Sequence, residues 1–441
     1  MANIIYFCTV KAITTVVIAL FLLARSTCLA QETTASDTSP LPPAHETVAT
    51  DSGDYYASMD SVHISLLTCT PFEAIYALYG HTAIRVQDLR NGMDIAVNYG
   101  CFDFEAPFFA LRFVFGLTDY EMGVEYYRDL RYKYKYFQCS IIQQEINLKR
   151  EEKAAILAAM GVNILPENRV YRYNYFYDNC TTRARDIIVN NLNGYVTYGE
   201  EPFEGPTFRQ IVHGCTDDYP WARFGDDFLL GVKADMSTTR TEYQFLPANL
   251  MTDFGNAVIT DLDGTKRPLV KSTTVVLDAP VRVPSSEFPL SPTACAVILL
   301  LVTIVITVTE RLTRHTLYIY DALLMTLCGL SGIILFAMIF SQHPTVSLNF
   351  QLLLLNPLPL FFIYRMIKRT RRHTQDWQYK MWTALIVLAM IGGIWQNYAE
   401  GMYLIALSLL IRNIVGMART ATYGKPLTRK TGNKTKDGTR K

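Results

Sequence analysis

The pattern of apolar positions divides the chain near residue 292. Beyond that point come apolar stretches, each near the length a helix needs to cross a bilayer, separated by polar connectors. We expect five membrane-spanning helices, over Thr293–Thr309, Thr316–Phe340, Val346–Tyr364, Trp382–Trp395 and Met402–Val415. The pattern therefore predicts an all-α, five-helix membrane domain over residues 292–418.

The connectors between these stretches differ in charge. Basic residues gather between the first and second stretches, between the third and fourth, and in the tail over residues 419–441. The connectors Ser341–Thr345 and Gln396–Gly401 carry no Lys or Arg. Because basic loops remain on the cytoplasmic side, we expect a cytoplasmic tail and an exported part before residue 292.

The N-terminus has a shorter apolar run, Ala12–Leu23, followed by small residues that end at Ala30. This pattern is typical of a secretory signal peptide, residues 1–30, and indicates that the part of the chain that follows is exported. A lipobox ending at Cys28 and an uncleaved anchor are the alternatives. Residues 31–57 are polar and lack apolar periodicity, which predicts a flexible tether.

The body of the exported part, residues 58–285, mixes short strand patterns with helical patterns. Strand patterns cover Ser61–Leu67, Thr82–Val86 and Asp94–Tyr99, and helical patterns cover Glu151–Met160 and Thr181–Asn191. Asn91-Gly92 supplies a turn signal between the second and third strands. This mixture predicts an α+β domain.

Two aromatic stretches of this body are open to two interpretations. Tyr126–Tyr136 favours a half-buried strand over a surface that lies against lipid headgroups. Phe108–Phe115 favours core over a surface that contacts acyl chains. For both stretches we expect the structural role.

Composition excludes a cytosolic enzyme with a single core, because 50% of the residues are hydrophobic and only 18% are charged. Soluble domains carry about 25% charged residues. The net charge of +1 gives no indication of nucleic-acid binding. The exported body keeps Cys69, Cys101, Cys139, Cys180 and Cys215, an odd set that leaves at least one thiol without an intramolecular disulfide in an oxidising compartment.

Two short segments carry candidate chemistry. Tyr79–Thr82 delivers a histidine, His81, at the start of a strand, and Asp178–Thr181 places Cys180 where a loop meets a helix. Unpaired amides and the helix dipole at that end favour the thiolate over the thiol. We therefore interpret Cys180 as a nucleophile and His81 as its base, a pair suited to acyl chemistry.

Both residues also have plainer interpretations. Cys180 is then half of a disulfide, and His81 is a hydrogen-bonded core histidine. A metal site is not expected, because no Cys or His pair has the spacing of a zinc motif. His63 and His213 have no setting comparable to that of His81, which favours the catalytic interpretation.

A histidine on a strand, followed much later by an Asn-Cys pair that opens a helix, resembles the circularly permuted, papain-like branch of the NlpC/P60 superfamily. The resemblance implies that fold for the α+β domain. It also implies a third polar group on the strand after the histidine. Asn98 is the nearest match by position, and Asp103 is the rival.

More of the chain resembles one family, the Lnb-type bacterial lipoprotein N-acyltransferases, in which a periplasmic domain precedes five membrane helices. The similar segments, besides those of His81 and Cys180, are Ser65–Cys69, Asn98–Phe104, Asn168–Asn174 and Phe245–Pro247. The resemblance implies that Cys180 takes an acyl chain from a membrane phospholipid as a thioester. The chain then passes to the α-amine of the lipidated N-terminal cysteine of a diacylated lipoprotein. The expected partners are the lipid bilayer and these two substrates, with no cofactor, metal or nucleic acid.

Four more polar residues are candidates for lipid contact. Arg85 and Arg183 suit a lipid phosphate, although motif arginines as often form internal ion pairs. Asn349 and Asn356, the latter before Pro357, interrupt apolar stretches and suit either a lipid channel or a fastening between helices.

Two other functions are compatible with the sequence. A periplasmic NlpC/P60-like cysteine hydrolase or peptidase, acting on cell-wall peptides or lipids, would use the same thiol and imidazole. A non-catalytic binding or sensory module of the envelope would leave Cys180 with a structural role.

Overall fold

The computed structural model describes residues 57–72, 77–103, 105–199, 202–279, 288–372, 374 and 376–423. The predicted signal peptide, the predicted tether before residue 57 and the basic tail from residue 424 lie outside this part of the chain. All described residues belong to one compact unit, residues 53–441.

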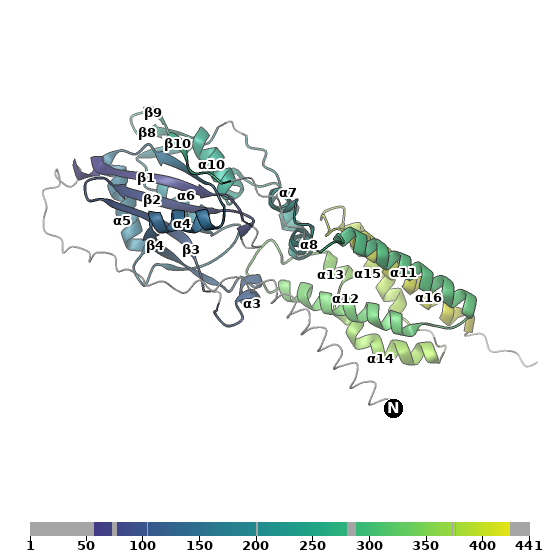
Figure 1. The fold of residues 1–441 in the computed structure, drawn as a ribbon. Coiled ribbons are helices and arrows are strands. Elements are labelled where there is room, and N and C mark those ends of the chain that lie inside the picture. The colour runs from purple at the N-terminus through teal and green to yellow at the C-terminus, as the bar shows by residue number, and fades with distance from the viewer. Residues whose placement is uncertain are drawn as a thin grey trace, which may run out of the picture. The chain divides into compact units, whose positions relative to one another are not determined.

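A seven-stranded antiparallel sheet forms the centre of the N-terminal domain (Figure 1), in the order β10-β5-β1-β2-β3-β4-β6. The strands are β1 (Val62–Cys69), β2 (His81–Asp88), β3 (Met93–Cys101), β4 (Asp119–Tyr126), β5 (Ile141–Ile146), β6 (Val170–Arg172) and β10 (Val270–Leu277). The three strands predicted from the sequence are β1 to β3, which are neighbours. Gly92, with φ of 67°, makes the predicted turn between β2 and β3.

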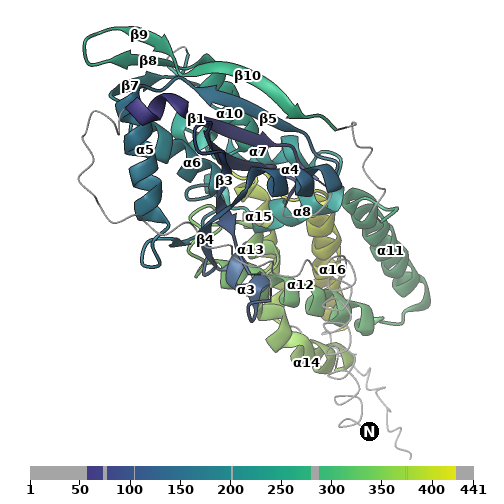
Figure 2. The same ribbon diagram turned by 60° about the vertical axis from the view of Figure 1, so that its left-hand side comes forward.

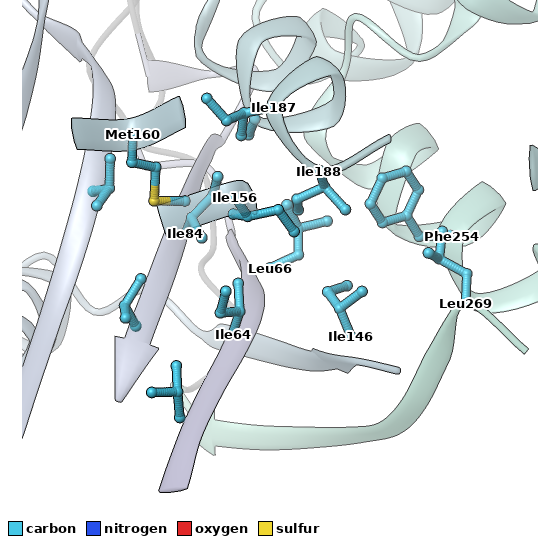
Figure 3. Packing of buried hydrophobic residues seen from close by; sticks show 14 of the residues in the cluster. Ile64, Leu66, Ile84, Ile146, Ile156, Met160, Ile187, Ile188, Phe254 and Leu269 are labelled. Atoms are coloured by element: carbon cyan, nitrogen blue, oxygen red, sulfur yellow. The ribbon is translucent and has the colours of Figure 1, made fainter. Parts of the chain in front are cut away.

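Helices cover both faces of this sheet. On one face lie α5 (Arg150–Asn163), α6 (Cys180–Val189) and α10 (Pro247–Asn256), and on the other lies α4 (Tyr127–Tyr136). On the first face Leu66 and Ile84 of the sheet meet Ile188 of α6 (Figure 3). Their neighbours Leu67 and Ala83 point the other way and pack with Leu130 of α4. The N-terminal domain is therefore the predicted α+β domain.

Helix α4 corrects the expectation of a strand over Tyr126–Tyr136. The buried residues of this segment are Tyr127, Leu130 and Tyr134, spaced three and four apart as on one side of a helix. Tyr132 and Tyr136 point to solvent. Tyrosines at alternate positions imitate the period of a strand, which is why the prediction was wrong.

Smaller elements complete the N-terminal domain. They are η1 (Met59–Ser61), α3 (Phe109–Val114), β7 (Gly194–Thr197), α7 (Phe208–Thr216), α8 (Pro220–Leu229), η3 (Val232–Asp235), α9 (Arg240–Tyr243), β8 (Val258–Asp261) and β9 (Lys266–Pro268). Strands β7, β8 and β9 form a second sheet, and the β8–β9 hairpin continues into β10 (Figure 2). Buried Glu152 of α5 binds Arg267 of β9 at 2.6 Å and fixes this sheet to the domain.

The C-terminal region consists of apolar helices. They are α11 (Pro292–Thr313), α12 (Tyr318–Met338), α13 (Gln351–Leu354), α14 (Leu358–Arg371), α15 (Gln378–Gly392) and α16 (Met402–Tyr423). Ser291 caps α11 and Pro292 occupies its first turn, a combination that starts helices efficiently. Helix α11 packs against α16, and α12 against α14. Within the described residues, α11 and α12 are the two helices long and apolar enough to span a membrane.

The third predicted span is interrupted rather than continuous. Helix α13 ends at Leu354 and α14 begins at Leu358, with Asn356 and Pro357 between them. Proline lacks the amide that a helix interior needs and disfavours helical backbone in the residue before it. Asn356 stabilises the break, because its Oδ1 accepts from the Leu358 amide at 3.2 Å.

Polar side chains of the helical region bind the end of α8. Nδ2 of Asn349 donates to the Phe228 carbonyl at 2.9 Å, and Nε2 of Gln351 donates to the Asp227 carbonyl at 2.9 Å. Nε2 of Gln396 donates to the carbonyl of Leu230 at 3.1 Å. The last carbonyls of a helix have no partner within it, so these amides satisfy groups that burial would leave unpaired.

A buried ion cluster lies beside these contacts between α8 and the helical region. Arg209 of α7 pairs with Asp227 at 2.6 Å and with Asp235 at 2.9 Å, and all three side chains are almost fully buried. Asp235 also accepts from Nδ2 of Asn397 at 2.7 Å. The contacts of Gln396 and Asn397 come from a connector that carries no Lys or Arg, in agreement with its predicted location outside the cytoplasm.

We predict that Arg209→Ala destabilises the protein by about 3–5 kcal/mol, because two buried carboxylates lose the guanidinium between them. The thermal midpoint of the full-length protein in detergent micelles measures this. Arg150→Ala is the matched control, since its ion pair with Asp60 is exposed, and its midpoint should change little. An Arg209→Ala midpoint equal to that of the wild type would contradict the prediction.

Candidate active site

Cys180 is the first residue of α6, and Asn179 caps that helix. The Oδ1 atom of Asn179 accepts from the amides of Thr181 and Thr182 at 2.8 and 2.9 Å. An asparagine cap stabilises a helix start by about 1 kcal/mol relative to alanine. The cap does not use the amide of Cys180 itself. The Cys180 thiol, which forms no disulfide, lies at the positive end of the helix dipole. The backbone amide of Cys180 is available beside it as a hydrogen-bond donor.

The imidazole of His81 approaches this thiol from the start of β2, close enough for each group to shift the pKa of the other. Nε2 of His81 lies 3.0 Å from Oδ1 of Asn98 on β3. Nδ2 of Asn98 in turn donates to Oε1 of Glu125 on β4 at 2.7 Å. Because Glu125 accepts the amide protons, Oδ1 faces the histidine and must accept from Nε2–H. Nδ1 is then left to receive the thiol proton.

The electrostatics of the pair favour ionisation. Burial alone raises the pKa of the Cys180 thiol, but the charge and hydrogen bond of His81 more than offset it and lower the pKa to about 7. The amide of Thr82 and the hydroxyl of Thr181 act in the same direction. Burial lowers the pKa of His81, yet the interaction with Cys180 dominates and the pKa is raised from its ordinary value. Both shifts favour a thiolate–imidazolium pair.

Two glycines allow His81 to approach Cys180 closely. A Cβ on Gly80, whose φ is 75°, would lie 2.7 Å from the Cys69 carbonyl, so the turn into His81 requires glycine. A Cβ on Gly100 would lie 3.1 Å from Cε1 of His81 and 3.6 Å from Cβ of Cys180. Gly100 therefore leaves room where strand and helix residues meet.

Tyrosines surround the thiol. Tyr120, Tyr171 and Tyr173 are close enough for the charge of Cys180 to contribute to raising their pKa values, after the larger effect of burial. The rings of Tyr120 and Tyr173 stack with centroids 4.0 Å apart. The hydroxyl of Tyr171 donates to the Tyr99 carbonyl on β3. Aromatic rings therefore lie near the thiol.

The structure brings Cys180, His81 and Asn98 together. The rival Asp103 instead accepts from the amide of Glu105 in its own loop at 2.8 Å. The catalytic roles of the three residues remain predictions.

The four candidate lipid-contacting residues all have internal partners. Arg85 binds Asp94 at 2.6 Å, and Arg183 binds Asp178 at 2.6 Å. Asn349 binds the end of α8, and Asn356 stabilises the break between α13 and α14. These contacts correspond to the ion-pair and fastening alternatives. Lipid binding by the four residues remains a prediction.

Glu125 was missed at the sequence level. It lies on β4 opposite Ala96, two residues before Asn98 along β3, and therefore shares the face of Asn98. Only the strand register shows this, and β4 was not predicted.

Metal-binding groups and cavities were also sought among the described residues. Among the residues that the structure describes, no group of three His, Cys, Asp or Glu side chains could hold a metal ion. A cavity lined by Asp321, Gln378 and Arg412 lies among α12, α14, α15 and α16 and contains none of the thiol-site residues.

An α+β domain with a thiol–imidazole pair, followed by apolar helices, defines a membrane protein with an extramembrane thiol site. The model for the Lnb N-terminal periplasmic domain matches residues 52–214, and the model for the Lnb transmembrane domain matches residues 284–423. The chain therefore belongs to the Lnb-type family and has a periplasmic N-terminal part. No curated protein and no solved structure matches it. His81, Asn98 and Cys180 all lie within the matched periplasmic domain.

We predict that Cys180 in the full-length protein is alkylated by iodoacetamide with a midpoint near pH 7. The thiolate is the reactive form, so a pKa lowered to about 7 leaves half of it ionised at that pH. Cys101 and Cys215, whose pKa values burial raises to about 11, should stay unlabelled. Peptide mass spectrometry across pH measures each site.

His81→Gln should move the midpoint of Cys180 upward, because burial is then no longer offset. Labelling at pH 7 should fall roughly 50-fold or more, because unopposed burial keeps the pKa of the thiol at or above its ordinary value of 9.0. His63→Gln is the matched control, since His63 pairs with Glu145 on another part of the sheet. An unchanged midpoint in His81→Gln would contradict the assignment.

Proposed function

We propose that this protein is a membrane-anchored thiol acyltransferase that transfers a phospholipid acyl chain to the N-terminus of lipoproteins. The observation that carries the proposal is the Cys180 thiol at the start of α6, beside His81, which lowers the pKa of the thiol to about 7. Membership of the Lnb-type family supports it, because the resemblance noted in the sequence implies this reaction.

In the first half-reaction the Cys180 thiolate attacks an ester carbonyl carbon of a phospholipid. A C–S bond forms, the ester C–O bond breaks, and His81 gives its proton to the departing alkoxide. A lysophospholipid leaves and the acyl chain remains on Cys180 as a thioester. The Cys180 amide, which the Asn179 cap does not use, is available to donate to the oxyanion.

In the second half-reaction the α-amine of a diacylated lipoprotein attacks the thioester carbonyl. A C–N bond forms, the C–S bond breaks, and neutral His81 takes the proton lost by nitrogen. The products are a triacylated lipoprotein and the regenerated thiolate–imidazolium pair. Asn98 and Glu125 act as positioning residues, because their hydrogen bonds engage Nε2 of His81 and leave Nδ1 free to exchange the proton with sulfur.

The attachment of the domain suits substrates that are fixed in a bilayer. The Asn349 and Gln351 contacts with α8 and the contact of Asn397 with Asp235 hold the thiol domain against the helical region. The proposed location is the outer face of a bacterial inner membrane, with a cytoplasmic tail. A hydrolase that acts on cell-wall peptides has no comparable need for contacts that hold its thiol domain against membrane helices.

The test is mass spectrometry of lipoprotein N-terminal peptides from cells with and without the gene. Deletion should remove the N-acyl group, and wild-type protein should restore it. Cys180→Ala should not restore it, because no thioester can form. Cys215→Ala, which removes another partly buried thiol of the same domain, should restore it fully.

Restoration by Cys180→Ala would refute the mechanism. N-acylation that survives deletion, together with altered cell-wall peptides, would instead support the hydrolase.

A further inference from the structure

We infer that the segment around α3 contacts the outer leaflet and starts an aromatic route along which an acyl chain reaches Cys180. This inference rests on the proposed function. It names the lipid bilayer as the occupant of one apolar surface, defined by Phe108, Leu111 and Leu117.

Hydrogen bonds hold α3 beside the end of a membrane helix. Oγ of Ser341 donates to the Val114 carbonyl at 3.0 Å, and the amide of Gln342 donates to the Phe115 carbonyl at 2.9 Å. Nε2 of His343 lies 3.0 Å from the Phe113 carbonyl. Helix α11 leaves the periplasmic domain and α12 returns, so the residues just after α12 lie at the periplasmic surface. Helix α3 is therefore at the level of the outer leaflet.

The surface of α3 and its flanks is apolar and exposed. Phe108 is 79% exposed, Leu111 57% and Leu117 40%. Sequence reasoning favoured core for Phe108–Phe115, and for Phe108 and Leu111 this was wrong. Large exposed apolar side chains that continue from a membrane helix suit the boundary of a bilayer rather than water.

Stacked rings connect this surface with the thiol. Phe109 of α3 stacks on Phe102 with centroids 5.3 Å apart, and Phe102 stacks on Tyr120 at 4.6 Å. Tyr120 stacks on Tyr173 at 4.0 Å. The charge of Cys180 contributes to raising the pKa of both tyrosines, after the larger effect of burial. This row of stacked rings is largely covered, with Tyr120 only 7% exposed, and offers apolar contacts to a hydrocarbon chain that leaves the leaflet.

Photocrosslinking tests the bilayer contact independently of catalysis. Benzoylphenylalanine replaces Phe108 in full-length Cys180→Ala protein, reconstituted in vesicles of phosphatidylethanolamine and phosphatidylglycerol. Irradiation should attach phospholipid to the peptide that contains position 108. The control is position 262, where Leu262 is 89% exposed in the β8–β9 turn, and it should give about a tenth of that yield or less. Equal yields, or no lipid adduct at position 108, would overturn the inference.

A rate comparison tests the route. The rate of Cys180 acylation by vesicle phospholipid is divided by the rate with a water-soluble ester, p-nitrophenyl acetate. This ratio should fall about tenfold in Phe109→Ala. It should stay at the wild-type value in Tyr195→Ala, which removes an exposed aromatic ring from β7. An unchanged ratio in Phe109→Ala would overturn the route.

The photocrosslinking experiment and the rate comparison together separate this inference from the proposed function. If the wild type forms no thioester with phospholipid, the proposed function and the acyl route both fail. Crosslinking at position 108 still reports whether α3 touches lipid.

Discussion

The hydrogen bonds of Asn179 are the constraint on which the site depends. Its oxygen accepts from the amides of Thr181 and Thr182 in the first turn of α6, and its Nδ2 donates to the carbonyls of Tyr175 and Phe245 at 2.8 and 3.0 Å. One buried side chain thus fixes the helix start against the preceding turn and against the distant segment that contains Phe245. Because Cys180 is the next residue, these bonds also fix the backbone that carries the thiol. Loss of any of these bonds would leave a buried polar group unpaired.

Buried hydrogen bonds also connect the thiol site with the helical region. The hydroxyl of Tyr79, two residues before His81, donates to Asp226 of α8 at 2.8 Å. Burial raises the pKa of Asp226 to about 6, while the bond from Tyr79 opposes that rise. The end of α8 is in turn bound by Asn349 and Gln351 of the helical region. Polar contacts therefore connect the strand that carries the base with the helices that hold the protein at its substrates.

What could be predicted from the sequence was mostly local. Strands β1 to β3 follow from alternating apolar residues and an Asn-Gly turn, and Cys180 was marked by its place where a loop meets a helix. The partners of these residues could not be predicted, because Glu125 meets Asn98 only through strand register. Alternating tyrosines concealed a helix in α4, and the role of Asn349 depends on α8, which is distant in the sequence. Short-range patterns determine elements, whereas contacts between distant segments determine the site.

The most direct test of the central claim is the intact mass of the full-length protein after incubation with phospholipid vesicles and no lipoprotein acceptor. The account predicts an added acyl group on the peptide containing Cys180, released by neutral hydroxylamine as thioesters are, together with lysophospholipid in equal amount. An unmodified Cys180, or an acyl group that is attached to another residue, would contradict it.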